Sequence, residues 1–558
     1  MATPTKELKK PPEVYDLREV KTVHDWIELL KSEGEYREVH AKVDWDCEIG
    51  TIARYCMSAK NGVALLFDNI KDHASTWCKK LFTNSVSSYG RFALAFGLPK
   101  ATGHKDLVLA MRQVYRKSLS PKEVSEAPLK QNILKGDDID LNQIPVPKWH
   151  LWDGGRFINT FAPVITRDPD SGRYNMGIYR GMVADQNHIS CLLAPSQGWG
   201  DHYTKLRDRQ EPMKVACVYG CNPLLTILAG SAFGRLVSEY DVYGGIVGEP
   251  LELIQCETSD LLVPASAEMV IEGTMSWDRK DYMMEGPFAE HCGYYGGAYS
   301  PKPTLKVDCI TFRDDPIYQG SCESIRPGWP TEDAYITSLS SSALVWNHLE
   351  ACGVPGVTDV WMNLDGPFFM IYVQIRQSYR HQAKQIASAI WGMSFANWAF
   401  KNVMVVEEDI DIRDHGQLEW AFCTRVNPAM GDIVIFENHF GSVLDPSTPF
   451  EERDLVQFGS GKWARMLIDA TRNWDLGGRP FWNNQVFPPV VVLSQEEEDL
   501  VRSRWDEYGL SDIKYEPTMN IDKDEDLKQR YAFNSRPTPE YLEDHGGGHA
   551  VPERKGSE

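Results

Sequence analysis

The middle of this chain is patterned differently from both ends, and this contrast constrains the fold more than any other feature. In residues 18–125 and again in 331–480, amphipathic stretches with helical spacing alternate with short apolar stretches typical of strands. In residues 126–330, turn signals such as Asp168-Pro-Asp-Ser-Gly and Gly244-Gly recur between short strands. The pattern predicts an α+β multidomain protein in which a barrel-like β domain lies between two α/β units.

Individual segments make this prediction concrete. We expect helices at 24–31, from 89 onward, at 222–230 and at 381–390, and strands at 36–43, 63–67, 368–373 and 403–406. Residues 481–534 are expected to form an extension whose helix, 495–509, ends at Gly509. Residues 1–17 are expected to be a loose arm, and residues 535–558, with three consecutive glycines and much charge, a disordered tail.

Composition excludes several classes of function. The net charge of −21 over 558 residues argues against nucleic acid and anionic membranes as partners. No apolar run approaches the roughly 18–20 residues that span a membrane, and the N-terminus has no apolar signal region. The 12 cysteines are too dispersed for a disulfide scaffold. We therefore expect a cytoplasmic globular protein with reduced thiols.

Two short motifs carry the chemistry. Asn175-Met-Gly-Ile-Tyr-Arg180 supplies a neutral oxygen ligand and a permanent cation, and Glu285-Gly-Pro-Phe-Ala-Glu290 places two carboxylates around a Gly-Pro pair. An arginine can hold a carboxylate through two hydrogen bonds, and a carboxylic acid can move a proton. If the fold brings them together, the motifs predict an enzyme that acts on an acid. Spacing alone favours the alternative, an exposed ion pair worth roughly 0–1 kcal/mol.

Six further blocks accompany these motifs along the chain. They are Asp153-Gly-Gly-Arg-Phe, Ser238-Glu-Tyr-Asp, Val263-Pro-Ala-Ser-Ala-Glu-Met-Val-Ile-Glu-Gly273, Glu408-Asp-Ile-Asp-Ile, Trp420-Ala-Phe-Cys-Thr-Arg425 and Gly441-Ser-Val-Leu-Asp-Pro-Ser447. With these eight blocks in order, the chain resembles the UbiD-like (de)carboxylase family, whose members use prenylated FMN. The resemblance runs from about residue 18 to about residue 515.

The resemblance implies a fold and an activity. It implies that the central domain is a split β-barrel that holds the flavin and that the C-terminal α/β domain mediates oligomerisation. The activity implied is reversible non-oxidative decarboxylation of an aromatic or α,β-unsaturated acid through a covalent prenylated-FMN adduct. Small residues at Ala194 and Ser442 leave room for a bulky acid or a CoA thioester, and residues 324–329 and 391–398 are expected to line the substrate pocket.

The resemblance also assigns roles to residues. Arg180 would bind the substrate carboxylate, Glu285 would orient Arg180, and Glu290 would protonate the carbon that CO₂ leaves. Glu290 would then need a raised pKa, which burial beside Phe288 and a like-charged neighbour would favour. Asn175 and Glu239 would bind a divalent cation, Mn or Mg with Fe as an alternative. The expected cofactor contacts are Ile178, Tyr179, Arg180, Leu192, Leu193, Ala194, Gln197, Gly198 and Arg425.

The chain departs from the ferulate-decarboxylase branch of this family at two points. Gly198 stands where that branch has a metal-binding histidine, and His202 is either a substitute ligand or a packed residue. A lysine that approaches the cofactor in that branch has no counterpart here. Arg425 would lie near the flavin phosphate and a K⁺ ion, or alternatively would cap the end of a strand.

The implied partners are an aromatic acid and CO₂, a flavin prenyltransferase as supplier of the cofactor, and further copies of the chain in a homodimer or homohexamer. Two alternatives remain open at this point. One is an FMN-dependent oxidoreductase, although no nicotinamide-binding glycine fingerprint follows a strand. The other is a non-catalytic subunit of a multi-subunit carboxylase, which would have no need for Arg180, Glu285 and Glu290.

Overall fold

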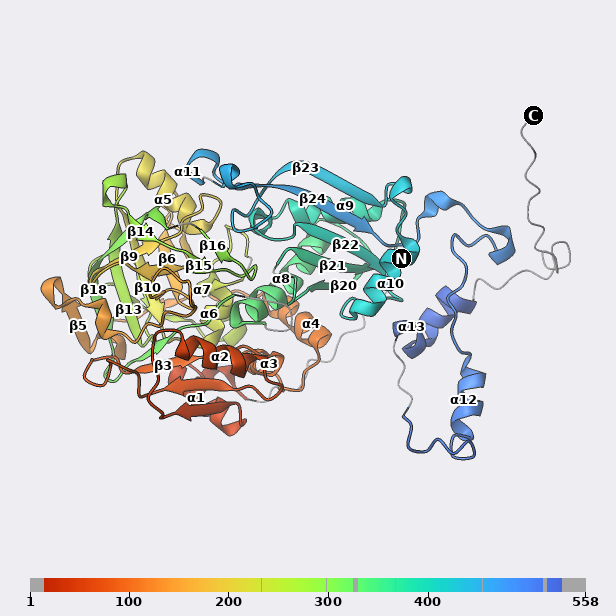
Figure 1. Ribbon diagram of the computed structural model, residues 1–558, viewed down its shortest axis with the longest axis horizontal. Coiled ribbons are helices and arrows are strands. Elements are labelled where there is room, and N and C mark those ends of the chain that lie inside the picture. Colours follow the sequence, from red (N-terminus) through yellow and green to blue (C-terminus); the bar gives the residue numbers. More distant parts are fainter. Residues whose placement is uncertain are drawn as a thin grey trace.

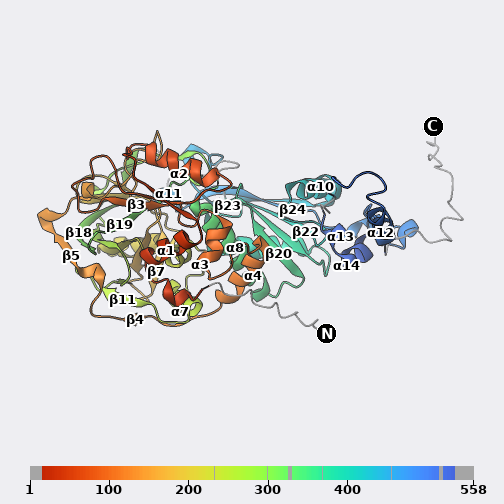
Figure 2. The same ribbon diagram turned by 90° about the horizontal axis from the view of Figure 1, so that it is seen from below.

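The computed structural model describes residues 15–231, 233–297, 299–324, 330–366, 368–453, 455–514 and 519–533. The chain forms three units in succession: a four-stranded sheet with its helices, a curled central sheet and a C-terminal five-stranded sheet. In Figure 1 the central sheet lies at the left, the C-terminal sheet to its right and the N-terminal unit below. An extension bearing three short helices lies beyond the C-terminal sheet in both views (Figures 1 and 2). This is the α+β multidomain architecture that the sequence predicts.

The N-terminal unit begins with α1 (Val23–Ser32), which is amphipathic and starts with a Thr22–Asp25 capping box. Its apolar residues, spaced for one helix face, are buried. The sheet has the order β1-β2-β3-β19, so a strand from the far end of the central region completes it. The elements are β1 (Tyr36–Val39), α2 (Glu48–Ser58), β2 (Ala64–Phe67), β3 (Lys80–Thr83), α3 (Tyr89–Ala95), α4 (His104–Val114) and β19 (Ile317–Gln319).

The central unit is an antiparallel sheet with the order β7-β6-β10-β13-β18-β9-β8, and β5 pairs with β18. It curls into a half-barrel, which confirms the predicted split barrel. Its strands are β5 (Asn132–Lys135), β6 (Pro163–Arg167), β7 (Tyr174–Ile178), β8 (Gly181–Val183), β9 (His188–Cys191), β10 (Met213–Tyr219), β13 (Met269–Met275) and β18 (Thr304–Phe312). Three helices accompany it: α5 (Gly198–Asp208), α6 (Pro223–Ala229) and α7 (Glu239–Val247).

Short strand pairs flank this sheet. The set β4 (Lys122–Glu123), β11 (Glu252–Gln255) and β12 (Leu262–Pro264) forms one small sheet. Two hairpin-like pairs, β14 (Met283–Glu285) with β17 (Ser300–Lys302) and β15 (Phe288–Ala289) with β16 (Tyr295–Gly296), carry the second chemical motif. The motif therefore stands at the ends of strands, where side chains can face a common space.

The C-terminal unit begins with the 20-residue helix α8 (Glu332–Ala351), which packs against β20 and α4. Its sheet has the order β20-β21-β22-β24-β23. The elements are β20 (Val357–Met362), β21 (Met370–Ile375), α9 (Gln382–Trp391), β22 (Asn402–Glu407), α10 (His415–Arg425), β23 (Ile433–Gly441), α11 (Leu455–Phe458) and β24 (Gly461–Asp469). The extension contains α12 (Gln495–Ser503), α13 (Asn520–Lys523) and α14 (Glu525–Lys528).

The predicted helix over 495–509 is shorter than expected. A Ser494–Glu497 capping box fixes its start, but it ends at Ser503. Residues 504–509 continue as turns, and the Trp505 indole donates to the carbonyl of Ile513 at 2.9 Å across the bend at Gly509. The predicted disordered tail and residues 1–14 of the predicted arm lie outside the described residues. Over the described part of the chain, no helix is long and apolar enough to cross a membrane.

Glu332 joins α8 to the N-terminal unit. Its fully buried carboxyl accepts hydrogen bonds from the backbone N–H of Asn84 at 2.9 Å and of Val86 at 3.0 Å. We expect Glu332→Ala to lower the free energy of unfolding by about 3 kcal/mol, because two buried donors lose their acceptor. Glu332→Gln, which keeps one acceptor oxygen, should lose less. Urea denaturation measures both, and an unchanged free energy in the alanine variant would contradict this account.

Candidate active site

A cavity of about 540 Å³ opens between the curled sheet and the C-terminal unit. One wall comes from β7 and the segment after β9, another from the first turn of α8, and a third from residues 394–398 and 441–444. Both chemical motifs reach it: Asn175 to Arg180 on one side, and Phe288, Glu290 and His291 on the other. Its volume is in the range of sites that bind cofactors and drug-sized ligands.

Arg180 is the buried cation of this cavity. It follows β7, and its guanidinium Nη2 donates to Glu285 Oε2 at 2.9 Å while Nε lies 2.8 Å from Glu285 Oε1. Its Nη1 donates to Glu290 Oε1. The three side chains are at most 8% exposed, so this is not the solvent-exposed ion pair that spacing alone would allow. The fold brings together the three residues predicted from two distant motifs.

The electrostatics of Glu290 differ from the expectation. Burial does raise the pKa of this carboxyl, but Arg180 and His291 outweigh it and hold the pKa below its ordinary value. The pKa of Arg180 is correspondingly raised: burial opposes its charge, and Glu285 and Glu290 more than compensate. In this state of the cavity Glu290 is therefore an anion paired with Arg180. The expected raised pKa was wrong because it weighed burial and the like charge without the paired cation.

Three more ionisable residues line the same end of the cavity, and sequence analysis missed them. Burial, together with Asp333 and Glu290, raises the pKa of Glu323 well above its usual range, and burial also raises that of Asp333. His291 Nδ1 lies 3.5 Å from Glu290 Oε2. The helix-start pattern Thr331-Glu-Asp333 was the one available signal, since Asp333 stands in the first turn of α8.

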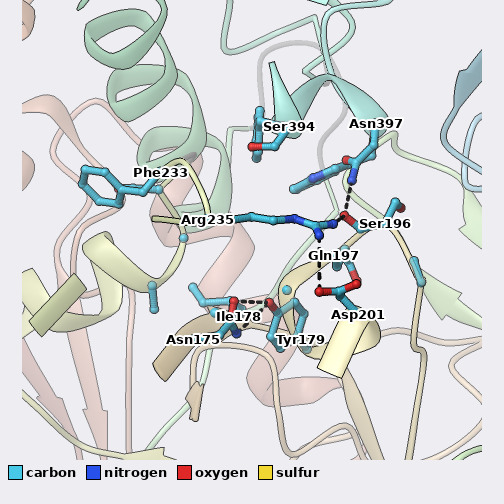
Figure 3. Close-up of a pocket in the computed structure, with 18 of the residues that line it drawn as sticks. Asn175, Ile178, Tyr179, Ser196, Gln197, Asp201, Phe233, Arg235, Ser394 and Asn397 are labelled. Atoms are coloured by element: carbon cyan, nitrogen blue, oxygen red, sulfur yellow. Dashed lines mark hydrogen bonds and ion pairs between the residues drawn. The ribbon is translucent and has the colours of Figure 1, made fainter. Parts of the chain in front are cut away.

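The other end of the cavity holds the predicted metal ligands. Asn175 and Glu239 both line it, and the Asn175 amide donates to the Tyr179 hydroxyl at 3.1 Å (Figure 3). Burial raises the pKa of Glu239, the first residue of α7, to about 8. A Cβ at Gly198 would lie 1.8 Å from Asn175 Oδ1. The Asn175 side chain thus occupies the space that any larger residue at 198 would need.

A cation crosses this end of the cavity. Arg235 extends from the segment between α6 and α7 toward α5, where Nη1 lies 3.3 Å from Asp201 and Nη2 lies 3.5 Å from the Ser196 carbonyl (Figure 3). Asn397 approaches from the C-terminal unit and donates through Nδ2 to the same carbonyl at 2.8 Å. Asn397 Oδ1 is buried and has no hydrogen-bond partner. This end therefore offers a positive charge and an unused acceptor.

The remaining predicted residues divide into two groups. Those that line the cavity are Ile178, Tyr179, Leu192, Ala194, Gln197, Gly198, His202 and Ser442. Leu193 instead packs into the core, because alternate side chains of an extended segment face opposite sides. His202 Nδ1 bonds to the Thr166 hydroxyl at 2.9 Å, and no three His, Cys, Asp or Glu side chains of the described residues are grouped as a metal site.

Arg425 does not belong to the cavity. It is the last residue of α10, is 4% exposed, and its Nη1 donates to Asp409 Oδ1 at 3.1 Å. Asp409 also accepts from Arg472 at 2.9 Å. The Arg425 guanidinium, which was expected near a flavin phosphate, thus pairs with Asp409 inside the C-terminal unit. Of the predicted pocket segments, residues 325–329 lie outside the described residues, while Ser394, Phe395, Asn397 and Trp398 line the cavity.

The site is a buried arginine between two carboxylates, enclosed by a curled β sheet and an α/β sheet. This arrangement suits an enzyme that acts on a carboxylic acid. Family models identify it further. Three of them match, described as the N-terminal, Rift-related and C-terminal domains of 3-octaprenyl-4-hydroxybenzoate carboxy-lyase, at residues 27–111, 122–326 and 334–470. The chain belongs to the UbiD family of carboxy-lyases.

Individual relatives agree with this. The chain is 28% identical over 507 residues to the pyrrole-2-carboxylic acid decarboxylase of Pseudomonas aeruginosa, covering 87% of this chain and 98% of that protein. It is 30% identical over 513 residues to an uncharacterized protein of Aquifex aeolicus, with coverages of 88% and 98%.

Solved structures are similar as well. Vanillic acid decarboxylase of Sedimentibacter hydroxybenzoicus in its closed form has a TM-score of 0.77 at 28% identity, covering 89% of this chain and 100% of that one. The UbiD-class enzyme HmfF of Pelotomaculum thermopropionicum in complex with FMN has a TM-score of 0.68 at 27% identity, with coverages of 81% and 94%.

The contact between Gly198 and Asn175 gives a direct test. In Gly198→Ala the new methyl must displace the Asn175 amide and break its bond to Tyr179. If this cavity binds FMN, as the similar HmfF structure does, we expect the affinity to fall at least about tenfold, equivalent to about 1.4 kcal/mol. Flavin fluorescence titration measures the affinity. Gly234→Ala is the matched control, since Gly234 lines the same cavity and a Cβ there meets nothing within 4 Å. Equal affinities of the two variants would show that the contact does not matter.

Proposed function

We propose that this carboxy-lyase catalyses the reversible non-oxidative decarboxylation of an aromatic or α,β-unsaturated acid and that it uses prenylated FMN. The observation that carries the proposal is the buried Arg180, held by Glu285 and Glu290 at one end of a 540 Å³ cavity. The relatives named as pyrrole-2-carboxylic acid and vanillic acid decarboxylases support an aromatic substrate. A bulky acid or CoA thioester is the outer limit of the substrate range we propose.

The residues at the far end of the cavity fit a flavin phosphate and ribityl chain. The N-terminus of α5 has no side-chain cap, and its first residue, Gly198, lines the cavity. Free amides at a helix N-terminus favour phosphate, and Arg235 adds a positive charge beside them. The unused Asn397 Oδ1 would accept from a hydroxyl or a ring N–H. One similar structure contains prenylated FMN.

A divalent cation also fits. Asn175 and Glu239 offer two hard oxygen ligands in the cavity, and Mg²⁺ or Mn²⁺ completes such sites with phosphate oxygens and water. A bound cation would favour the ionised form of Glu239, whose pKa burial alone raises to about 8. We propose Mn or Mg at this position, with Fe as an alternative. For K⁺, the expected neighbour Arg425 lies outside the cavity, so no described residue argues for it.

The protein residues would divide the work as follows. When bound, prenylated FMN supplies the electron sink that an sp² carbon lacks on losing CO₂, through a covalent bond to the substrate. Arg180 holds the substrate carboxylate, and Glu285 keeps the guanidinium in place. A carboxylate that occupies Arg180 weakens its attraction for Glu290, so that burial then raises the pKa of Glu290. Glu290 would then take up a proton from solvent and give it to the carbon that CO₂ leaves.

The cavity wall suits a flat substrate. Phe368 and Trp398 meet edge to face with centroids 5.8 Å apart, and the His291 ring stacks on Phe368 at 4.9 Å. Such rings stack on planar acids and exclude water. We further propose a homodimer or homohexamer in the cytoplasm, supplied with cofactor by a flavin prenyltransferase. The intact trio disfavours a purely structural subunit, because a scaffold would not need to bury three charges.

The proposal is tested by co-expression with a flavin prenyltransferase, followed by cofactor mass and a screen of aromatic acids for CO₂ release. In this assay we expect Glu290→Gln to retain the cofactor and to lose about 10²–10⁴-fold in kcat, because the amide cannot transfer the proton. Glu211→Gln, on the surface of the same unit, is the control. Near-normal turnover of Glu290→Gln would remove Glu290 from its role, and plain FMN with nicotinamide-dependent turnover would favour the oxidoreductase.

Removal of Glu239 tests the metal ligands. We expect Glu239→Ala to lose the divalent cation and most of the flavin together, because the carboxylate is the only charged ligand of the proposed pair. Metal content by mass spectrometry and flavin content by absorbance measure the two losses. Glu252→Ala, at an exposed position of β11, controls for loss of charge. Full flavin and metal occupancy in Glu239→Ala would show that the ligand assignment is wrong.

A further inference from the structure

A turn behind the cavity, His150 to Gly154, contacts the segment that carries both catalytic carboxylates. We call residues 285–296, from the end of β14 through β16, the catalytic hairpin. His150, Asp153 and Cys322 do not line the cavity, yet Asp153 is 4% exposed and Cys322 fully buried. The Asp153-Gly-Gly motif of the sequence belongs to this turn, and the proposed mechanism gives it no role.

Three hydrogen bonds join the turn to the hairpin. The Ala289 amide, adjacent to Glu290, donates to Asp153 Oδ1 at 3.0 Å. The Gly154 amide donates to the Pro287 carbonyl at 2.8 Å. The Trp152 amide donates to the Tyr295 hydroxyl at 3.2 Å. Because Tyr295 pairs with Ala289 across β15 and β16, the turn holds both strands of the hairpin.

Asp153 is itself held from behind. Its Oδ2 accepts from the His150 amide at 2.9 Å and lies 3.2 Å from His150 Nδ1. His150 Nε2 lies 3.2 Å from Arg54 Nη1 and 3.4 Å from Cys322 Sγ. The His150 ring thus links Asp153 on one side to Arg54 and the Cys322 thiol on the other. The network ties the hairpin to α2 and to the segment that precedes Glu323.

The contact surface leaves no room for adjustment. A Cβ at Gly154 would lie 1.9 Å from the Gly286 carbonyl oxygen, and one at Gly296 would lie 2.4 Å from Glu290 Cγ. Gly154 therefore lets the turn approach the hairpin closely, while Gly296, inside the hairpin, leaves space for the Glu290 side chain. The position of Glu290 against Arg180 is therefore fixed from the outside by the turn and not only by the ion pair.

We propose that the turn 150–154 is the positioning element of the catalytic hairpin and that Asp153 is its central residue, holding Glu290 in reach of Arg180 and the substrate. Asp153 does not line the cavity, so it acts through Glu290. The kinetic part of this inference rests on the proposed decarboxylase function; the structural part does not.

The experiment compares Asp153→Ala, Asp153→Asn and wild type as cofactor-loaded enzymes. We expect kcat to fall about 100-fold in Asp153→Ala with KM and flavin content nearly unchanged, because small misplacements of a catalytic group cost this much. Asp153→Asn should recover at least about tenfold of that loss, since its Oδ1 still accepts from Ala289. Asp185→Ala is the control: the Asp185 carboxylate also accepts from a backbone amide, that of Asn187, and also pairs with a nearby histidine, His188, but it is exposed and lies outside the hairpin.

Two readouts separate positioning from general stability. Deuterium exchange of the peptide 285–296 should accelerate in Asp153→Ala while peptides of β10 and β13 stay protected. In the profile of kcat against pH, the limb that reflects Glu290 should move to higher pH. The pKa of Glu290 rises because a freed hairpin weakens its pairing with Arg180 and His291, while Glu323 and Asp333 still face its carboxyl. Wild-type kcat and exchange in Asp153→Ala would overturn the proposal.

If Asp153→Ala gives no folded protein, Tyr295→Phe decides, because it removes only the acceptor of the Trp152 amide from a ring that is 38% exposed. A kcat loss of about threefold or more with faster exchange of the hairpin supports the proposal, and no change in either overturns it. Absence of CO₂ release in wild type would instead refute the decarboxylase function, and the exchange data would still test the turn.

Discussion

The ion triple of Arg180, Glu285 and Glu290 is the interaction on which the rest of this structure depends. A buried cation is tolerated only where buried anions and hydrogen bonds compensate it, and removal of one partner leaves an uncompensated charge. The three residues come from the end of β7, the end of β14 and the end of β15, so these ends must meet. The curl of the central sheet achieves this, and the cavity forms around the charges.

The triple also explains how one carboxyl can be both a counter-ion and an acid. Without substrate, Arg180 lowers the pKa of Glu290 although burial favours the protonated form. A substrate carboxylate competes for the same guanidinium, which removes the attraction and leaves the burial. Proton delivery is thereby coupled to binding of the carboxylate that is lost. Only when that carboxylate occupies Arg180 does the pKa of Glu290 rise far enough for Glu290 to hold a proton that it can donate.

Much of the fold was predictable because local patterns agree with it. The helix at 24–31 buries the face that its periodicity indicates, and the apolar strand at 63–67 is buried throughout, whereas the strand predicted at 36–43 already ends at Val39. The C-terminal helix was overestimated because regular helical hydrogen bonding stops at Ser503 and residues 504–509 form turns that lead to the bend at Gly509. At the site, Arg180, Glu285 and Glu290 were predictable from motifs. Glu323, Asp333 and Arg235 were not, since only the fold reveals which isolated charges face a cavity. The sign of the pKa shift of Glu290 likewise needs the distance to Arg180.

The departure at Gly198 shows why a motif has to be interpreted together with its neighbours. Taken alone, glycine in place of a metal-binding histidine signals the loss of a ligand. In the structure, the Asn175 amide fills the vacated space, Tyr179 holds that amide, and Trp199 stacks on Tyr179 with centroids 4.4 Å apart. The position is therefore not an isolated loss but one member of a packed group that includes a proposed metal ligand. A Cβ placed at position 198 would meet the Asn175 amide in this conformation, so a histidine there would require that amide to move.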